Sequence, residues 1–157
     1  MVTGQPDAAL DGVYKLSMAA GKPRLKLSES LEKVTLPGIK QVLSFREKTG
    51  AFFGAETVIL SEEEKASVIY HPFQPSKFLN IEHFRQEPLL RMVMENGKRI
   101  SPAPSLKDIA SYAKKRLALL PGEYKRFENP HIYKVGISEK LAKLKNSLVE
   151  QHQITKK

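Results

Sequence analysis

Cysteine is absent from all 157 residues of the chain, which excludes disulfide bonds and thiolate-bound metals. Long apolar runs are absent as well, so no segment is predicted to cross a membrane. Residues 1–7 lack the basic and apolar regions of a secretory signal peptide. A cysteine-free chain without these signals is compatible with a reducing compartment, and we expect a cytoplasmic protein.

The familiar catalytic motifs are absent too. The glycine-rich phosphate-binding motifs and the Gly-x-Ser-x-Gly nucleophile motif do not occur. The four histidines are scattered, with no pair four residues apart as in a helical zinc site. His71 and His83 could act as general bases, but neither has a carboxylate or nucleophile at a diagnostic spacing, which favours packing or surface roles. The residues therefore predict no catalytic site and no metal site.

Positive charge is concentrated in the last third of the chain. The net charge of +9 divides into +3 over residues 1–46, −1 over residues 47–104 and +7 over residues 105–157. Such a bias attracts anions of any kind, including nucleic acids and phosphorylated metabolites. The aromatic residues of this third are not interleaved with Lys and Arg in a stacking pattern, so nucleic acid is disfavoured as a partner.

The most informative segment is the stretch over residues 22–42, which we call the basic ribbon. Leu25 and Leu27 alternate with polar neighbours, which is the period of a half-buried strand. Its polar side chains include four cations and three hydroxyls: Arg24, Lys26, Lys33, Lys40, Ser28, Ser30 and Thr35. The ribbon is either a phosphate-facing surface or a solvated sheet face, and its spacing does not decide between them.

A turn and a returning strand end the basic ribbon. Pro37 presets φ at the second position of residues 36–39 and Gly38 supplies positive φ at the third, so we predict a type II turn. Residues 40–46 are then predicted to form a strand. Together with a strand over residues 12–18, these segments predict an antiparallel meander.

Further strands are predicted at residues 57–60 and 89–94, with a loop at 47–54 and irregular structure over residues 70–87. Asn96-Gly97 is a strong hairpin signal, because both positions tolerate positive φ, so residues 98–100 should pair back on the preceding strand. Met92 and Met94 are interpreted as core filler. The acidic run at residues 61–64 could mimic a paired-carboxylate site, but adjacent acids are typical of a solvated loop or helix start.

Two helices are predicted near the C-terminus. Ser105 can cap the first, with Asp108 completing an acidic capping box, and Pro121 ends or kinks it. Its apolar residues recur at three- and four-residue spacing. Ser138 can cap the second helix, and residues 151–157 should fray.

We therefore predict an α+β fold: an antiparallel sheet or meander followed by two C-terminal helices, in one domain over residues 1–157. Residues 1–104 are expected to be mainly β and residues 105–157 mainly α.

Several segments carry a resemblance to a known enzyme family. The first group is residues 10–16 (Leu-Asp-Gly-Val-Tyr-Lys-Leu), 26–29 (Lys-Leu-Ser-Glu), 32–38 (Glu-Lys-Val-Thr-Leu-Pro-Gly) and 40–42 (Lys-Gln-Val). The second is residues 95–99 (Glu-Asn-Gly-Lys-Arg), 104–106 (Pro-Ser-Leu), 129–131 (Asn-Pro-His) with Tyr133, and Leu141 with Leu144. In order and spacing, over nearly the whole chain, these segments resemble the C-terminal region of the nicotinate phosphoribosyltransferases.

The resemblance implies a place in NAD biosynthesis. The family converts nicotinate and phosphoribosyl pyrophosphate to nicotinate mononucleotide and pyrophosphate, coupled to hydrolysis of ATP, with magnesium. A full member has an N-terminal α/β portion, a central barrel-like portion and a C-terminal region, and works as a dimer. This chain would be only the last of these, with the catalytic barrel absent. We expect it to bind no cofactor and to be inactive alone. A homodimer partner or an upstream domain would leave exposed apolar patches in its absence.

The resemblance assigns no catalytic residue to this chain, because the family's catalytic histidine and nicotinate-binding residues would lie upstream. A Gly-x-Gly-Thr phosphate-binding turn would end just before Met1, with Thr3 trailing it. The candidates for substrate or phosphate contact are Thr3, which would trail this turn, and Lys33 and Lys40 of the basic ribbon, and no metal ligand is assigned. Two alternatives from other classes are a basic assembly module for an anionic partner and a small RNA-binding protein.

Overall fold

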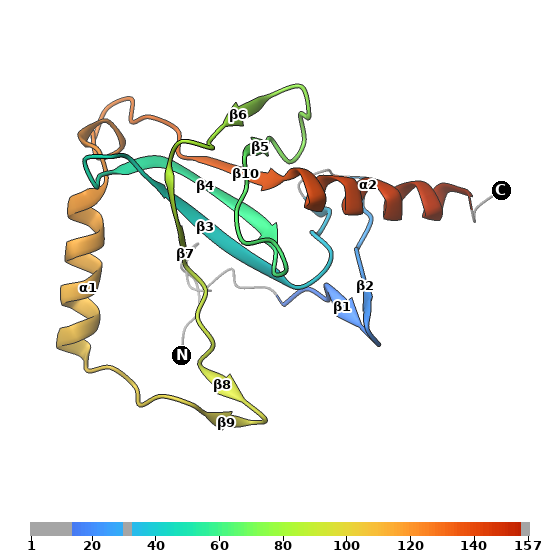
Figure 1. Ribbon diagram of the computed structural model, residues 1–157, viewed down its shortest axis with the longest axis horizontal. Coiled ribbons are helices and arrows are strands. Elements are labelled where there is room, and N and C mark those ends of the chain that lie inside the picture. Colours follow the sequence, from blue (N-terminus) through green and yellow to red (C-terminus); the bar gives the residue numbers. More distant parts are fainter. Residues whose placement is uncertain (1–13, 30–32, 155–157) are drawn as a thin grey trace, which may run out of the picture.

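The centre of the molecule is a six-stranded mixed sheet. The computed structural model describes residues 14–29 and 33–154. Within them the strands lie in the order β6-β5-β10-β4-β3-β7 (Figure 1). Their bounds are β3 (Lys40–Arg46), β4 (Phe52–Leu60), β5 (Val68–Tyr70), β6 (Phe78–Asn80), β7 (Arg85–Pro88) and β10 (Lys134–Ser138). No helix in these described ranges is long and apolar enough to cross a membrane.

All pairs in this sheet are antiparallel except one. β3 and β4 form a long hairpin with Val42 opposite Val58, and a bulge interrupts the ladder between Ser44 and Arg46. β10 enters between β4 and β5, parallel to β4 and antiparallel to β5. A strand from late in the chain thus lies between two strands from its middle.

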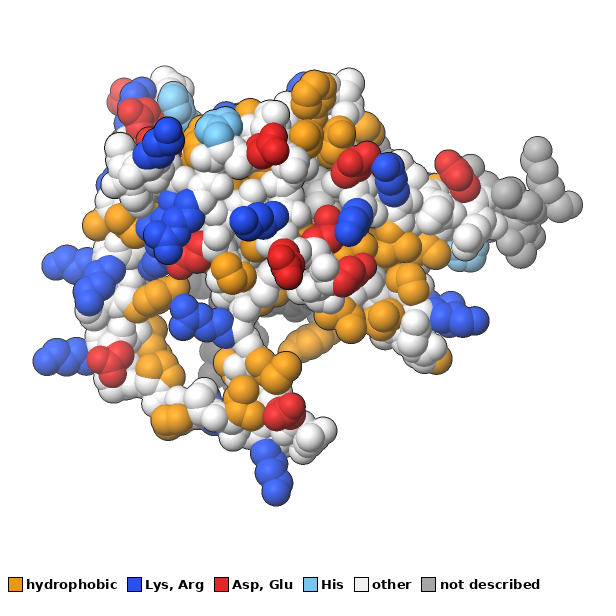
Figure 2. Space-filling view, in the orientation of Figure 1, with side chains coloured by type: hydrophobic (Ala, Val, Ile, Leu, Met, Phe, Trp, Pro, Cys, Tyr) orange, Lys and Arg blue, Asp and Glu red, His pale blue; other side chains and the backbone are white. Residues whose placement is uncertain are grey.

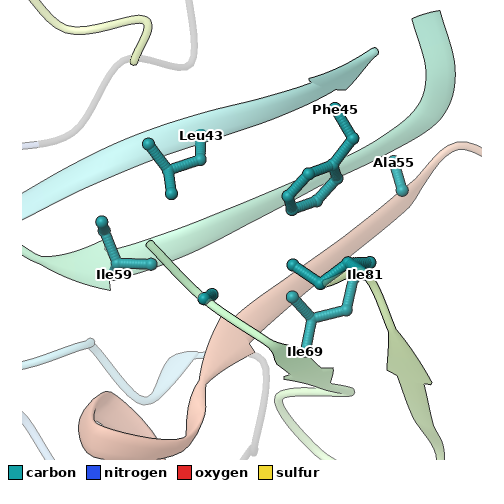
Figure 3. Packing of buried hydrophobic residues seen from close by; sticks show 7 residues of the cluster. Leu43, Phe45, Ala55, Ile59, Ile69 and Ile81 are labelled. Atoms are coloured by element: carbon teal, nitrogen blue, oxygen red, sulfur yellow. The ribbon is translucent and has the colours of Figure 1, made fainter. Parts of the chain in front are cut away.

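Each face of the sheet buries its own apolar cluster. The first cluster has Phe45, Ile59 and Ile81 as fully buried members, packed with Leu43, Ala55, Ala66 and Ile69 (Figure 3). The second lies under helix α2 (Glu139–Ile154) and contains Leu60, Ile137 and Leu141. The alternation of side chains along β3 and β4 supplies these two faces, because successive residues of a strand point in opposite directions.

α2 begins directly at the end of β10. The hydroxyl of Ser138 accepts a hydrogen bond from the backbone N–H of Leu141 at 3.2 Å, which caps the helix. The same hydroxyl donates to a carboxylate oxygen of Glu63 at 2.6 Å, and that oxygen also accepts from the backbone N–H of Leu60 at 2.8 Å. Glu63 therefore ties the start of α2 to the end of β4.

An arm and a helix extend from the edge strand β7. The arm comprises residues 89–104 and includes the hairpin of β8 (Met94–Glu95) and β9 (Lys98–Arg99). It leads into α1 (Leu106–Leu119), which returns toward the end of the sheet and is followed by the short 3₁₀ helix η2 (Gly122–Tyr124). Figure 1 shows that only the C-terminal end of α1 approaches the sheet.

The described residues of the basic ribbon before Lys40 lie beside the sheet and are not part of it. β1 (Met18–Ala19) and β2 (Lys22–Pro23) form a separate two-stranded hairpin. The backbone carbonyl of Ser17 accepts hydrogen bonds from the N–H groups of Arg24 at 2.9 Å and Gly38 at 2.8 Å. These two bonds hold the hairpin against the turn that precedes β3.

The structure confirms the α+β class and the strongest local predictions. The strand at residues 40–46 is β3, and Gly38 has the positive φ of +79° that the turn requires. Asn96 and Gly97 form the predicted hairpin with φ of +49° and +75°. Ser105 caps α1 by accepting from the N–H of Asp108 at 3.2 Å, and α1 ends before Pro121.

The meander predicted over residues 12–46 is wrong, because the described residues there do not form three consecutive paired strands. Of the described residues in the segment 12–18, only Met18 belongs to a strand, and residues 24–28 form no strand. The physical reason is local: the backbone N–H of Lys26 donates to the side-chain hydroxyl of Thr35 at 2.8 Å, in place of a continued ladder. Leu25 is half-buried and Leu27 is exposed, so their alternation does not mark a strand.

Other boundaries also differ from the predictions. β4 begins at Phe52, inside the predicted loop, and β6 and β7 lie in the stretch predicted to be irregular. Residues 89–93 form no strand, and Met92 and Met94 are exposed, so they are not core filler within this chain. β10 lies within the mainly helical part, and α2 continues through Ile154 where fraying was predicted.

Candidate functional site

The three candidate contact residues have very different surroundings. Thr3 lies outside the described residues. Lys33 is exposed. Lys40 is half-buried at the start of β3, where its ammonium group donates hydrogen bonds to the backbone carbonyls of Leu36 at 2.9 Å and Gly38 at 2.6 Å. Lys33 therefore faces solvent, whereas the ammonium group of Lys40 is engaged with the backbone.

Lys40 has a structural task in this arrangement. Its two carbonyl acceptors belong to the turn that joins the basic ribbon to the sheet, and Pro37 and Gly38 of that turn are buried. Partial burial holds the pKa of the Lys40 amine below its usual value of 10.5. The lysine clamps the turn because an ammonium group donates to several acceptors at once.

We expect Lys40→Met to destabilise the chain by about 1–2 kcal/mol, since two carbonyl groups lose a charged donor. Lys33→Met, at an exposed position, should change the free energy of unfolding by less than about 0.5 kcal/mol. Urea denaturation of the two variants checks both values. Equal stabilities for the two variants would contradict the clamp.

The basic ribbon borders a shallow cavity of about 400 Å³. Its lining residues are Tyr14, Lys15, Leu16, Arg24, Leu25, Lys26 and Thr35. Three cations therefore border one hollow, which is the electrostatic setting of an anion site. The hydroxyl of Thr35 accepts from the Lys26 backbone, so its oxygen is already engaged within the ribbon.

A second cluster of charged groups joins α1 to the sheet. Arg46 on β3 donates to the Glu87 carboxylate on β7 at 2.8 Å, and Arg116 on α1 donates to both oxygens of Glu87 at 3.1 Å. Both guanidinium groups also lie over the ring of Phe52, at 4.6 and 4.4 Å from its centroid. Glu87 is therefore a hub that fixes the C-terminal end of α1, because its carboxylate is occupied by two arginines.

The hydrogen bond from Arg46 holds the pKa of Glu87 below its ordinary value of 4.5, and Arg116 acts in the same direction. A carboxyl group with a lowered pKa stabilises the folded chain above its ordinary pKa, and this contribution is lost as the pH falls. Because Glu87 is partly exposed, we expect the contribution to be at most about 1 kcal/mol.

The expected result is that Glu87→Gln is less stable than the parent chain at pH 7, and that the difference shrinks as the pH falls below 4.5. Chemical denaturation of both proteins between pH 3 and pH 7 measures it. A stability difference that stays constant over this range would contradict the role of the charged carboxylate.

Tyr133 and Glu56 form another polar pair near this end of the sheet. The Tyr133 hydroxyl donates to the Glu56 carboxylate at 3.2 Å. Burial, with Glu56 adding to it, raises the pKa of Tyr133 well above its usual value of 10.0. The hydroxyl is thus a proton donor in a hydrogen bond and is unsuited to act as a base at neutral pH.

His71 and His83, the two histidines considered as general bases, have local partners. The Nδ1 atom of His71 accepts from the backbone N–H groups of Phe73 at 3.2 Å and Gln74 at 3.1 Å, which orders a turn. His83 stacks on Phe84, with ring centroids 4.2 Å apart. Within residues 14–29 and 33–154, no three His, Cys, Asp or Glu side chains are placed to hold a metal ion.

Exposed apolar side chains gather on α1 and the arm. Six of them, which we call the clasp surface, are between 48% and 85% exposed: Met92, Val93, Met94, Leu106, Ile109 and Leu117. No residue of α1 is buried, although its sequence has an apolar face. Figure 2 shows hydrophobic side chains along the arm and along α1, with cations at their margins.

A separate apolar groove of about 520 Å³ lies over β5, β6 and β10. Its exposed apolar members include Phe78, Ile132 and Val135, and Lys77 and Lys134 also line it. At one end the Lys145 ammonium group donates to the carbonyl of Pro72 at 2.9 Å.

Sequence reasoning missed the Glu87 hub and the groove. The acid and its two arginines are separated by 41 and 29 residues. The pairing of β3 with β7 brings Arg46 to Glu87, and the C-terminal end of α1 brings Arg116 there. β7 has the sequence Arg-Gln-Glu-Pro, which contains no apolar alternation that would predict a strand.

Comparison with known proteins finds a matching family model and several similar enzymes. A family model described as "Nicotinate phosphoribosyltransferase C-terminal domain" matches residues 39–145. The nicotinate phosphoribosyltransferase of Mus musculus is 33% identical over 152 residues, covering 94% of this chain and 28% of the mouse protein. That of Bacillus subtilis is 32% identical over 149 residues, covering 88% of this chain and 30% of the bacterial protein.

The fold agrees with the sequence comparison. A crystal structure of human nicotinic acid phosphoribosyltransferase matches with a TM-score of 0.71 and 31% identity, over 90% of this chain and 27% of the human one. The chain thus spans about 28% of the length of the mouse relative. The match of the C-terminal-domain model to residues 39–145 shows that the chain belongs to the nicotinate phosphoribosyltransferase family, in which it corresponds to the C-terminal region.

Proposed function

We propose that the chain supplies the C-terminal region of a nicotinate phosphoribosyltransferase. Such an enzyme forms nicotinate mononucleotide and pyrophosphate from nicotinate and phosphoribosyl pyrophosphate. The reaction is coupled to ATP hydrolysis, as in a ligase, and belongs to NAD biosynthesis. The observation that carries the proposal is the match of residues 39–145 to the C-terminal-domain model, together with curated relatives that bear this enzyme's name. Cytoplasmic location and a dimeric enzyme belong to the same proposal.

The chain alone is proposed to lack this activity. Phosphoribosyl transfer requires several groups that converge on the pyrophosphate and the ribose. In the described part of the chain, Glu87 is engaged by Arg46 and Arg116. The cations that border the hollow beside the basic ribbon supply only the setting of an anion site. Among the described residues no three His, Cys, Asp or Glu side chains meet, so these residues offer no metal site made of protein ligands alone.

The three candidate contact residues have different roles in this proposal. Lys33 is exposed and its side chain can reach an anionic ligand held by another part of the enzyme. Lys40 is engaged with two backbone carbonyls, which favours a positioning role for it. Thr3 is proposed as a contact on the resemblance alone.

The test is complementation. The purified chain is assayed for nicotinate-dependent release of pyrophosphate, alone and with the mouse relative from which the matching C-terminal region has been removed. We expect no release from either protein alone and release from the mixture. Activity of the purified chain alone would refute the proposed division of labour. A salt-dependent gel shift with RNA, without complementation, would favour the nucleic-acid alternative.

A further inference from the structure

The clasp surface is an apolar surface with no partner inside the described chain. Its α1 members recur at the spacing of a helix face that is normally buried: Leu106, Ile109 and Leu117. Its arm members precede and enter the β8–β9 hairpin: Met92, Val93 and Met94. Contiguous apolar patches of this kind mark interaction sites, because exposing them to water is unfavourable.

The attachment of α1 leaves this surface open. α1 is fixed to the sheet near its C-terminal end, where Arg116 binds Glu87 and lies over Phe52. The turns before Arg116 extend away from the sheet, and the arm runs from β7 to the far, N-terminal end of α1 (Figure 1). Two apolar elements thus extend from the body of the chain. α1 is attached to it by the ion pair at Arg116, and the arm is attached by its continuity with β7.

Charge argues against a second copy of this chain as the occupant. Residues 89–120 carry seven basic and two acidic side chains, and the whole chain has a net charge of +9. A symmetric dimer through the clasp surface would place this basic surface against itself. Like charges brought together in this way oppose association, whereas an acidic rim on a different partner would favour it.

The length of the relatives favours the rest of the enzyme as the occupant of the clasp surface. The mouse relative and the human structure are covered by this chain over only 28% and 27% of their lengths, so most of a family member lies outside the matched region. We propose that the clasp surface seats the preceding part of a nicotinate phosphoribosyltransferase, through an apolar patch with an acidic rim on that part. This inference rests on the proposed function and assigns the contact within it.

The experiment compares two matched double substitutions. Met92→Asp/Ile109→Asp changes the clasp surface, and Phe127→Asp/Ile132→Asp changes two exposed apolar residues elsewhere by the same charge. In the chain alone, both variants should melt within about 2 °C of the parent, since all four side chains are exposed. Association with the truncated mouse relative is then measured by interferometry, and we expect at least a tenfold loss for the clasp variant only.

A single-chain chimaera provides a second measurement, in case the truncated relative does not fold. This chain replaces the matching region of the mouse relative, and melting temperature and pyrophosphate release are recorded. The clasp variant should lower the melting temperature by several degrees relative to the control variant. If the parent associates and complements while the clasp variant behaves like the control, the inference fails and the proposed function stands.

Two further outcomes would overturn the inference. The proposed function fails, and the inference with it, if the parent chain neither associates with the truncated relative nor gives pyrophosphate release in the mixture or in the chimaera. If sedimentation shows that the chain dimerises alone, and the clasp variant but not the control is monomeric, the occupant is a second copy.

Discussion

Gly54→Ala is expected to destabilise the chain by about 3 kcal/mol or more, from positive-φ strain and overpacking together. Gly54 lies within β4 with φ of +78°, a conformation that side chains rarely adopt. An added Cβ atom would also overlap the ring of Tyr124, which packs against the backbone at this point. Chemical denaturation of the purified variant measures the loss, and failure to accumulate as soluble protein would agree with it.

Gly97→Ala is the matched control, because Gly97 has φ of +75° but open space around its Cα. It should cost only the backbone strain, about 1 kcal/mol. The double variant Gly54→Ala/Tyr124→Ala should lose less than the sum of its single changes, since the overlap is relieved. A Gly54→Ala variant no less stable than Gly97→Ala would show that the Tyr124 contact is unimportant.

Leu141→Ala is expected to lower the free energy of unfolding by about 2–5 kcal/mol, since it removes a buried side chain and leaves a cavity. Leu141 is 0% exposed and packs with Leu60 and Ile137 between α2 and the sheet. Leu117→Ala makes the same substitution in α1, where the leucine is 59% exposed, and should cost less than about 0.5 kcal/mol. Urea denaturation of both variants is the measurement.

Leu117 belongs to the clasp surface, so Leu117→Ala also tests whether this surface is uncovered in the isolated chain. Leu117 is expected to be nearly silent in the isolated chain and to matter once a partner covers α1. A large loss for Leu117→Ala in the chain alone would mean that α1 is packed more closely than its exposure indicates.

Local chemistry made much of the secondary structure predictable. The cap at Ser105, the Asn96-Gly97 hairpin and the strand at residues 40–46 each follow from a few neighbouring residues, and each is present. The α+β class followed from these elements, and the resemblance carried by the ordered segments identified the family that the comparisons show. Local signals were thus sufficient wherever the interaction that forms an element is itself local.

Non-local pairing set the limit of prediction. β10 is short and is stabilised by strands whose residues are more than 60 positions away, so its own sequence gave little sign of it. Met92 and Met94 of the arm alternate as buried residues do, yet both are exposed in this chain. Such an alternation predicts that side chains are buried but does not show which part of a protein covers them. For the same reason the candidate site was the least predictable part: the sequence indicated Lys33 and Lys40, whereas the Glu87 hub depends on the pairing of β3 with β7.

The late position of β10 has a consequence for how the chain folds. β4 and β5 cannot complete their ladders until residues 134–138 have been synthesised and released from the ribosome. Until then, both strands present unpaired backbone edges of the kind that promote aggregation. Because contacts between distant residues form slowly, the sheet is expected to close as a late step, with the capped start of α2 arriving together with its last strand.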